Sequence, residues 1–287
     1  MTRRPPKTFA DIKPRGRGKN REISASDKAA KLAALTALPP RQPFVISITT
    51  LYAWIAWIFL LPACFITART LATTLGGSLG DSFWRSAPFW FFSIGLCMWL
   101  ICFFFAPRPV KLYVWGHEMT HALFTILCRG KIKEFHVTAD GGHVITDRNN
   151  VLIALSPYFL PLYTVSSVLL FLLAGLAVDL TRRIALPWGG SLQPACLLYW
   201  FIGVTWCFHI TFTVWMIARG QPDLRINGTF FSLTLIILIN LGILAALLIL
   251  ASPTVSPGAF AARWGLYAQE TVESLWNAAR TLGGIRA

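Results

Sequence analysis

The sequence is poor in charged residues. Aspartate, glutamate, lysine and arginine make up 13% of its 287 residues, whereas hydrophobic residues make up 55%, and the mean hydropathy is +0.58. In a soluble domain about a quarter of the residues are charged. The composition therefore argues against a soluble globular protein and predicts an integral membrane protein.

Acidic residues are scarcer than basic ones. Only 12 aspartates and glutamates face 26 lysines and arginines, which gives a formal net charge of +14. Much of the excess lies in residues 1–42, a segment that has too few apolar residues to offset the entropy of ordering. We expect residues 1–42 to form a disordered basic tail that is held against anionic lipid headgroups and does not bind nucleic acid.

Cysteine and histidine are also sparse. The six cysteines include no Cys-x-x-Cys pair and fall mostly in apolar segments, so they predict neither a disulfide framework nor a cysteine-based metal site. Two of the five histidines, His117 and His121, belong to one short motif. That motif contains the main candidate functional residues of the sequence.

Long apolar runs, by contrast, are frequent. About 20 apolar residues in a helix cross the roughly 30 Å of hydrocarbon in a bilayer. We expect residues 43–251 to form an all-α, multi-pass bundle of about six transmembrane helices in the cell membrane. The predicted spans are Pro43 to Ala68, Pro88 to Ala106, Val110 to Cys128, Val151 to Val178, Pro194 to Ala218 and Thr229 to Ala251.

The motif His117-Glu118-Met119-Thr120-His121 lies in the third predicted span. On an α-helix its two histidines fall one turn apart on the same face, so both imidazoles can bind one Zn²⁺. Glu118 is then placed to act as general base toward water at the metal. The alternative is a pair of core histidines that bond to neighbouring hydroxyls.

Residues 131–147 alternate between apolar and polar side chains, with a turn sequence at Ala139-Asp140-Gly141-Gly142. This pattern predicts a small β-hairpin after the metal-binding helix. Its open edge could receive an extended peptide by strand addition, and Gly141, Gly142 and His143 are the expected substrate-binding residues. A plain surface loop is the alternative.

Residues 252–287 place large apolar side chains on one helical side and charged ones elsewhere. We expect them to form an amphipathic C-terminal helix that lies in the headgroup region of the bilayer.

A catalytic zinc ion needs a third protein ligand and one open position. Four residues are available after the motif: His136, His143, His209 and Asp223. His209 lies in the fifth predicted span, where a histidine bonded to a nearby threonine is the alternative interpretation. Asp223 is a carboxylate between two basic residues, and an ordinary loop charge is its alternative.

The order of these features resembles the site-2 protease-like intramembrane zinc metallopeptidases, peptidase family M50. The resemblance rests on Gly116 to Ala122 around the motif, the glycine-bearing hairpin and the sequence Ala154-Leu155-Ser156-Pro157, and it covers roughly residues 110–240. In that family a later helix supplies an aspartate as third ligand, usually in an Asn-Pro-x-x-x-Leu-Asp-Gly motif. Asp223 matches by order and distance, although it directly follows Pro222 and the next glycine is Gly228.

The resemblance implies a membrane-embedded zinc metalloendopeptidase that hydrolyses membrane-anchored protein substrates. His117, His121 and Asp223 would be its metal ligands and Glu118 its catalytic base. A second hypothesis, from a different class, is a catalytically inactive metal-binding scaffold, or pseudoprotease. A transporter with histidine cation sites would need more intramembrane charges than the sequence contains.

The basic tail and the resembled family predict opposite orientations of the chain in the membrane. The basic tail predicts a cytoplasmic N-terminus, and six spans would then place the hairpin outside. Members of the resembled family generally keep their site nearer the cytoplasm.

Overall fold

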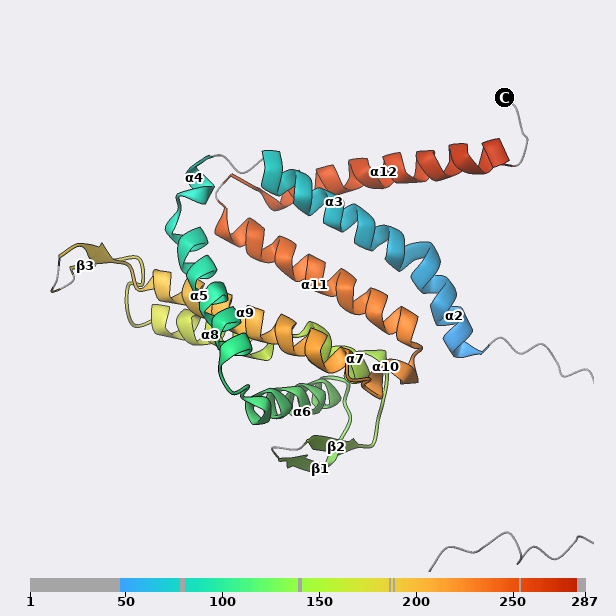
Figure 1. Ribbon diagram of the computed structural model, residues 1–287, viewed down its shortest axis with the longest axis horizontal. Helices are drawn as coiled ribbons and strands as arrows, with labels where there is room; N and C mark the ends of the chain where they lie inside the picture. The colour runs from blue at the N-terminus through green and yellow to red at the C-terminus, as the bar shows by residue number, and fades with distance from the viewer. Residues whose placement is uncertain are drawn as a thin grey trace, which may run out of the picture. The chain divides into compact units, whose positions relative to one another are not determined.

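The computed structural model describes residues 47–282 except 78–80, 139–140, 186, 188 and 253. The predicted basic tail at 1–42 lies outside these residues, as does the start of the predicted hairpin turn. Within the described part the chain is mostly helical, with two small antiparallel hairpins (Figure 1).

The first helix is longer than the sequence predicted. α2 (Ile48–Ile55), the π-helical segment η2 (Ala56–Leu60) and α3 (Leu61–Gly77) follow one another without a break. The prediction ended this span at Ala68 because polar residues follow. Those residues stay helical, since the hydroxyls of Thr70 and Thr74 donate to carbonyls one turn earlier, at 2.8 and 2.7 Å.

α5 (Ala87–Phe105) and α9 (Ala195–Ile217) are packed closely against each other. Small residues allow this approach: a Cβ added to Gly95 would collide with the carbonyl oxygen of Trp200, and one added to Gly203 would collide with that of Phe92. Small residues at helix contacts are the usual means of close packing within a membrane. The short helix α4 (Asp81–Trp84) precedes this pair.

The predicted span from Val151 to Val178 is not one straight helix. It consists of α7 (Val151–Phe159) and α8 (Leu162–Gly175), which are bent by 73° relative to each other. Pro161 causes the break, because it lacks an N–H group and disfavours helical geometry at the preceding Leu160. α8 then packs against α9.

By length and composition, four helical segments can cross a membrane, and the bent pair α7–α8 makes a possible fifth. The four are Ile48–Gly77, α5, α9 and α11 (Thr229–Ala251), all within the described residues. They indicate a membrane protein. The third predicted span corresponds to α6 (Val110–Leu127), which is not among them because Lys111 and the motif residues lower its hydropathy, so six spans are not confirmed.

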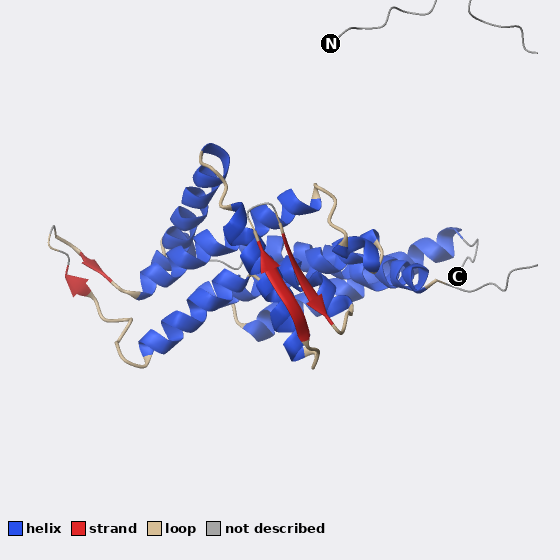
Figure 2. Ribbon diagram, turned by 90° about the horizontal axis from the view of Figure 1, so that it is seen from below, coloured by secondary structure: helices blue, strands red, loops and turns tan. Residues whose placement is uncertain are grey.

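Two hairpins accompany the helices. β1 (Ile132–Val137) pairs antiparallel with β2 (Gly142–Thr146), with His136 opposite His143, and the two strands lie against α6 (Figure 2). The second, very short hairpin was not predicted from the sequence. It joins β3 (Ile184–Ala185) to β4 (Ser191–Leu192) in the connection between α8 and α9.

The chain's last described element is α12 (Pro257–Leu282), a helix at the place where the sequence predicted one. It lies beside α3 (Figure 1). Trp264 Nε1 donates to Thr67 Oγ1 at 2.9 Å, and Arg69 pairs with Glu270 at 2.8 Å. Leu275 and Trp276 are exposed, whereas Trp264 and Tyr267 are half-buried. The place of this helix in the headgroup region of the bilayer stays a prediction.

Candidate metal centre

α6 supplies the two histidines. His117 and His121 lie one turn apart on the same face, with ring centroids 4.9 Å apart. α6 approaches α8 closely at this level because Gly116 has no side chain: a Cβ there would lie 2.8 Å from the ring of Tyr163. The helix period and this close contact together turn both imidazoles inward.

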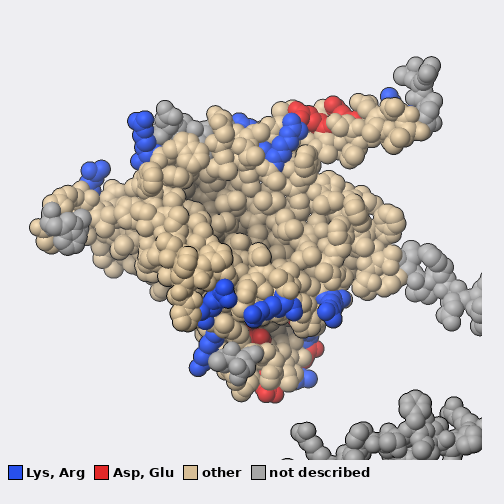
Figure 3. Space-filling view, in the orientation of Figure 1, with Lys and Arg blue, Asp and Glu red and all other residues tan. Residues whose placement is uncertain are grey.

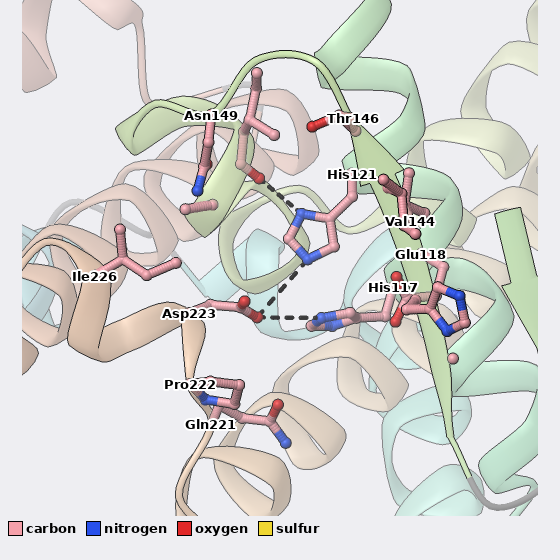
Figure 4. A pocket seen from close by; sticks show the side chains of 15 residues that line it. His117, Glu118, His121, Val144, Thr146, Asn149, Gln221, Pro222, Asp223 and Ile226 are labelled. Carbon is pink, nitrogen blue, oxygen red and sulfur yellow. Dashed lines mark hydrogen bonds and ion pairs between the residues drawn. The ribbon is translucent and has the colours of Figure 1, made fainter. Parts of the chain in front are cut away.

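The third member comes from α10 (Asp223–Ile226), between α9 and α11. The carboxylate Oδ2 of Asp223 lies 3.6 Å from Nε2 of His117 and 3.7 Å from Nε2 of His121. Figure 4 shows both imidazoles turned toward it. Among the described residues these three form a group that can hold a metal ion, since their ligand atoms lie within 4.8 Å of one another.

The chain around Asp223 is fixed by its neighbours. Gly220 and Gly228 adopt φ values of +80° and +86°, which favour glycine, on either side of α10. Leu224 is buried among apolar residues of α7 and α11, and its carbonyl accepts a hydrogen bond from Ser232 Oγ at 3.1 Å. Asp223 is therefore held at the end of a short, anchored helix.

Each of the three candidate ligands has an outer hydrogen-bonding partner. Tyr113 Oη lies 3.2 Å from His117 Nδ1, and the Ile153 carbonyl accepts from His121 Nδ1 at 2.8 Å. This hydrogen bond orients His121 so that its Nε2 faces Asp223, and Nε2 is the atom that would bind a metal ion. Tyr158 Oη donates to Asp223 Oδ2 at 2.9 Å.

The charge state of Asp223 also suits a ligand. Burial alone would raise the pKa of its carboxyl group, but the hydrogen bonds and charges of His117 and His121 outweigh burial and hold the pKa well below its usual range. The side chain is thus an ionised carboxylate at neutral pH. Two imidazoles and one carboxylate are a donor set that catalytic zinc sites use.

The spacing fits a small divalent ion. Two ligand atoms at tetrahedral positions around zinc, each about 2.0–2.1 Å from the metal, lie about 3.3 Å apart. The distances of 3.6 and 3.7 Å from the Asp223 carboxylate to the two imidazoles exceed this only slightly.

Glu118 lies beside these ligands at a cavity of about 530 Å³. The side chain is only 7% exposed and lies beneath β2, where a Cβ on Gly142 would come within 2.8 Å of Glu118 Cγ. All of β2 from Gly142 to Thr146 lines the cavity, and residues 221–223 lie among the other lining residues. Strand β2 and the metal group thus border one space (Figure 4).

The structure brings most of the predicted site residues to this cavity. His117, His121, Asp223 and Glu118 line it, and so do Gly142 and His143. Gly141 is described but is not among the lining residues.

The other candidate ligands do not belong to the metal group among the described residues. His209 is buried in α9 beside the backbone of Tyr158 and does not belong to the metal group. His136 lies on β1, and His143 Nε2 is 3.2 Å from Glu134 Oε1 on the hairpin.

Sequence reasoning missed the outer partners. Tyr113 could have been found, because it precedes His117 by four residues and so shares its helical face. Tyr158 and the Ile153 carbonyl come from α7, and their contacts with the site span 65 and 32 positions in the chain, so local spacing cannot predict them.

Basic side chains gather around the site end of the molecule. Figure 3 shows them over its lower part, close to the hairpin. Arg219 stacks on Trp215 with its guanidinium carbon 3.6 Å from the ring centroid, and Arg108 lies over the same ring at 5.5 Å. These basic side chains lie at the same end of the molecule as the hairpin, and none of them is among the residues that line the cavity.

Comparisons with known protein families, with curated proteins and with solved structures found no match. The function is therefore argued from the residues themselves.

Proposed function

We propose that this chain is a zinc-dependent intramembrane endopeptidase of the site-2 protease-like family, which hydrolyses membrane-anchored protein substrates. The observation that carries the proposal is the meeting of His117, His121 and Asp223, with Glu118 beside them, at one cavity. Membership of the family rests on the order of motif, hairpin and later aspartate. A multi-pass location in the cell membrane is part of the same proposal.

When bound, zinc supplies Lewis-acid chemistry, polarising the scissile carbonyl and lowering the pKa of water. Glu118 takes a proton from the attacking water, whose oxygen bonds to the carbonyl carbon. As the carbon–nitrogen bond breaks, Glu118 returns that proton to the departing amine. The close contact under Gly142 holds the Glu118 side chain in place for both transfers.

Substrate would enter as an extended peptide. Because β1 occupies one edge of β2, the other edge is the one available for strand addition along the cavity. Gly142 and His143 would contact the peptide there, with Gly141 at the beginning of the strand. A membrane helix must first unwind locally, since the carbonyls of an intact helix are engaged in hydrogen bonds.

The proposal is tested with Glu118→Gln, which keeps the size of the side chain and removes the base. The purified protein in proteoliposomes should retain its zinc, while cleavage of a membrane-anchored peptide falls by about 10²–10⁴-fold. Glu273→Gln is the matched control, because this carboxylate is exposed on α12 and is not among the residues that line the cavity. It should cleave like the wild type.

Undiminished cleavage by Glu118→Gln would remove Glu118 from the mechanism. Zinc binding by the wild type without cleavage of any membrane-anchored peptide would instead favour the inactive scaffold.

A further inference from the structure

The break between α7 and α8 leaves the Tyr158 carbonyl without its partner within the helix, and side chains of other helices bond to it instead. In an unbroken helix the Tyr158 carbonyl would accept from the amide of Leu162, but that amide bonds to Leu160 instead, at 2.9 Å. Asn240 of α11 donates its Nδ2 to the Tyr158 carbonyl at 3.0 Å. His209 of α9 also interacts with the Tyr158 backbone. Buried polar groups from two other helices thus converge on one residue.

The side chain of Tyr158 extends from this anchored backbone to the metal group. It is fully buried, its ring meets that of His117 edge-on at 5.2 Å, and its hydroxyl donates to Asp223 Oδ2 at 2.9 Å. A buried hydroxyl is costly unless it is paired. Here its partner is the one candidate ligand that does not come from α6.

We propose that Tyr158 is a positioning residue that orients the Asp223 carboxylate toward the two imidazoles. The inference rests on the metal-binding part of the proposed function and does not need proteolysis. A carboxylate oxygen has lone pairs for both a hydroxyl donor and a metal ion. The hydroxyl of Tyr158 therefore restricts rotation of the carboxylate without occupying its metal-binding position.

The Tyr158 hydroxyl matters because little else restrains the rotation of the Asp223 carboxylate. Its side chain is 22% exposed at the edge of the cavity, and α10 is only four residues long. Partners that orient a metal ligand change metal affinity by about 10–100-fold when they are removed.

The test is Tyr158→Phe, which removes the hydroxyl and keeps the buried ring. We would measure the dissociation constants for Zn²⁺ and Co²⁺ in the full-length purified protein, with the visible spectrum of bound Co²⁺. Tyr158→Phe should weaken binding about 10–100-fold and alter the spectrum. Tyr163→Phe is the matched control, because the Tyr163 hydroxyl donates to the Leu112 carbonyl at 2.6 Å, away from the ligand atoms. It should bind within about twofold of the wild type.

A double-mutant cycle shows whether Tyr158 acts through Asp223. In an Asp223→Ala background, Tyr158→Phe should cause no further loss of Co²⁺ affinity. A full loss in that background would overturn the positioning role, as would equal affinity and spectra for Tyr158→Phe and the wild type. A wild type that binds neither ion would overturn the metal centre itself and this role with it.

Discussion

At the scale of the residue, Gly142 shows how little space surrounds the proposed base. A Cβ at this position would lie 2.8 Å from Glu118 Cγ and 2.9 Å from the His136 carbonyl oxygen. Val114 Cγ1 would also lie 2.9 Å away. Since the His136 carbonyl belongs to the paired strand β1, the side chains of Glu118 and Val114 are the parts that can move. The absence of a side chain at Gly142 thus fixes where Glu118 lies.

Gly142→Ala should displace Glu118 while leaving the three metal ligands in place. A misplacement of about 1 Å in a catalytic group can cost about 10²-fold in rate, so we expect a clear loss of kcat with unchanged zinc content. Gly265→Ala is the control, because no atom lies within 4 Å of a Cβ at that position. An unaltered kcat in Gly142→Ala would contradict this account of the contact.

The sequence allowed part of the site to be predicted at this scale. His117 and His121 followed from helical spacing alone, and Asp223 from the order of motifs in the resembled family. The role of Tyr158 could not be predicted, because its contact with Asp223 spans 65 positions in the chain and depends on the break in the helix.

At the scale of the element, the contact between α5 and α9 depends on two glycines. Gly95 and Gly203 each face a backbone carbonyl of the other helix, so neither position has room for a methyl group. Within a bilayer such close packing replaces the hydrophobic effect as the attraction between helices. α9 carries His209 and leads into α10, so this contact also supports the site.

Gly95→Ala should destabilise the protein by about 1–3 kcal/mol, because overpacking forces the backbones apart. The measurement is thermal unfolding of the purified protein in detergent. Gly242→Ala in α11 is the matched control, since nothing lies within 4 Å of a Cβ there, and it should be neutral or stabilising by up to about 1 kcal/mol. Equal melting temperatures for Gly95→Ala and the wild type would argue against the tight contact.

The bounds of a helix could be predicted where hydropathy alone determines them. α11 runs from Thr229 to Ala251, as predicted, because a continuous apolar run bounds it. The break in the fourth predicted span was missed because Pro161 lies within an apolar run, and hydropathy does not register a missing N–H group. The extension of the first helix could not be predicted from hydropathy, because glycine and polar residues follow Ala68, whereas the hydroxyl of Thr70 bonds within the helix.

At the scale of the whole molecule, the arrangement of the helices bears on the conflict over orientation. Tyr52 stacks on Phe231 with ring centroids 4.7 Å apart, so the described chain begins beside the first turn of α11, which follows α10 and Asp223. Among the described residues α6 is not a candidate span, and the hairpin lines the same cavity as Asp223. Without a crossing by α6, the basic tail and the resembled family would place the hairpin on the same side of the membrane.

Basic residues favour a cytoplasmic site. They are more numerous at the site end than at the opposite end, where the connections hold Arg85, Arg182 and Arg183 and α12 carries Arg263 and Arg280. Those at the site end are Arg108, Lys111, Arg129, Lys131, Lys133, Arg148, Arg219 and Arg225. Positive residues are retained on the cytoplasmic side of membrane proteins.

We therefore expect single cysteines introduced as Arg148→Cys and Arg182→Cys, in a cysteine-free background, to react from opposite sides of the membrane. A membrane-impermeant maleimide should label the first only from the cytoplasm and the second only from outside. Labelling of both from one side, or in the reverse sense, would contradict the proposed orientation.

The central claim is that His117, His121 and Asp223 hold one zinc ion. X-ray absorption spectroscopy of the purified, zinc-loaded protein measures its coordination shell directly. The account predicts only nitrogen and oxygen ligands at about 2.0–2.2 Å, two of them imidazoles, with one oxygen ligand lost or replaced in Asp223→Ala and no change in His209→Ala. A sulfur shell at about 2.3 Å, or a shell that changes in His209→Ala and not in Asp223→Ala, would contradict it.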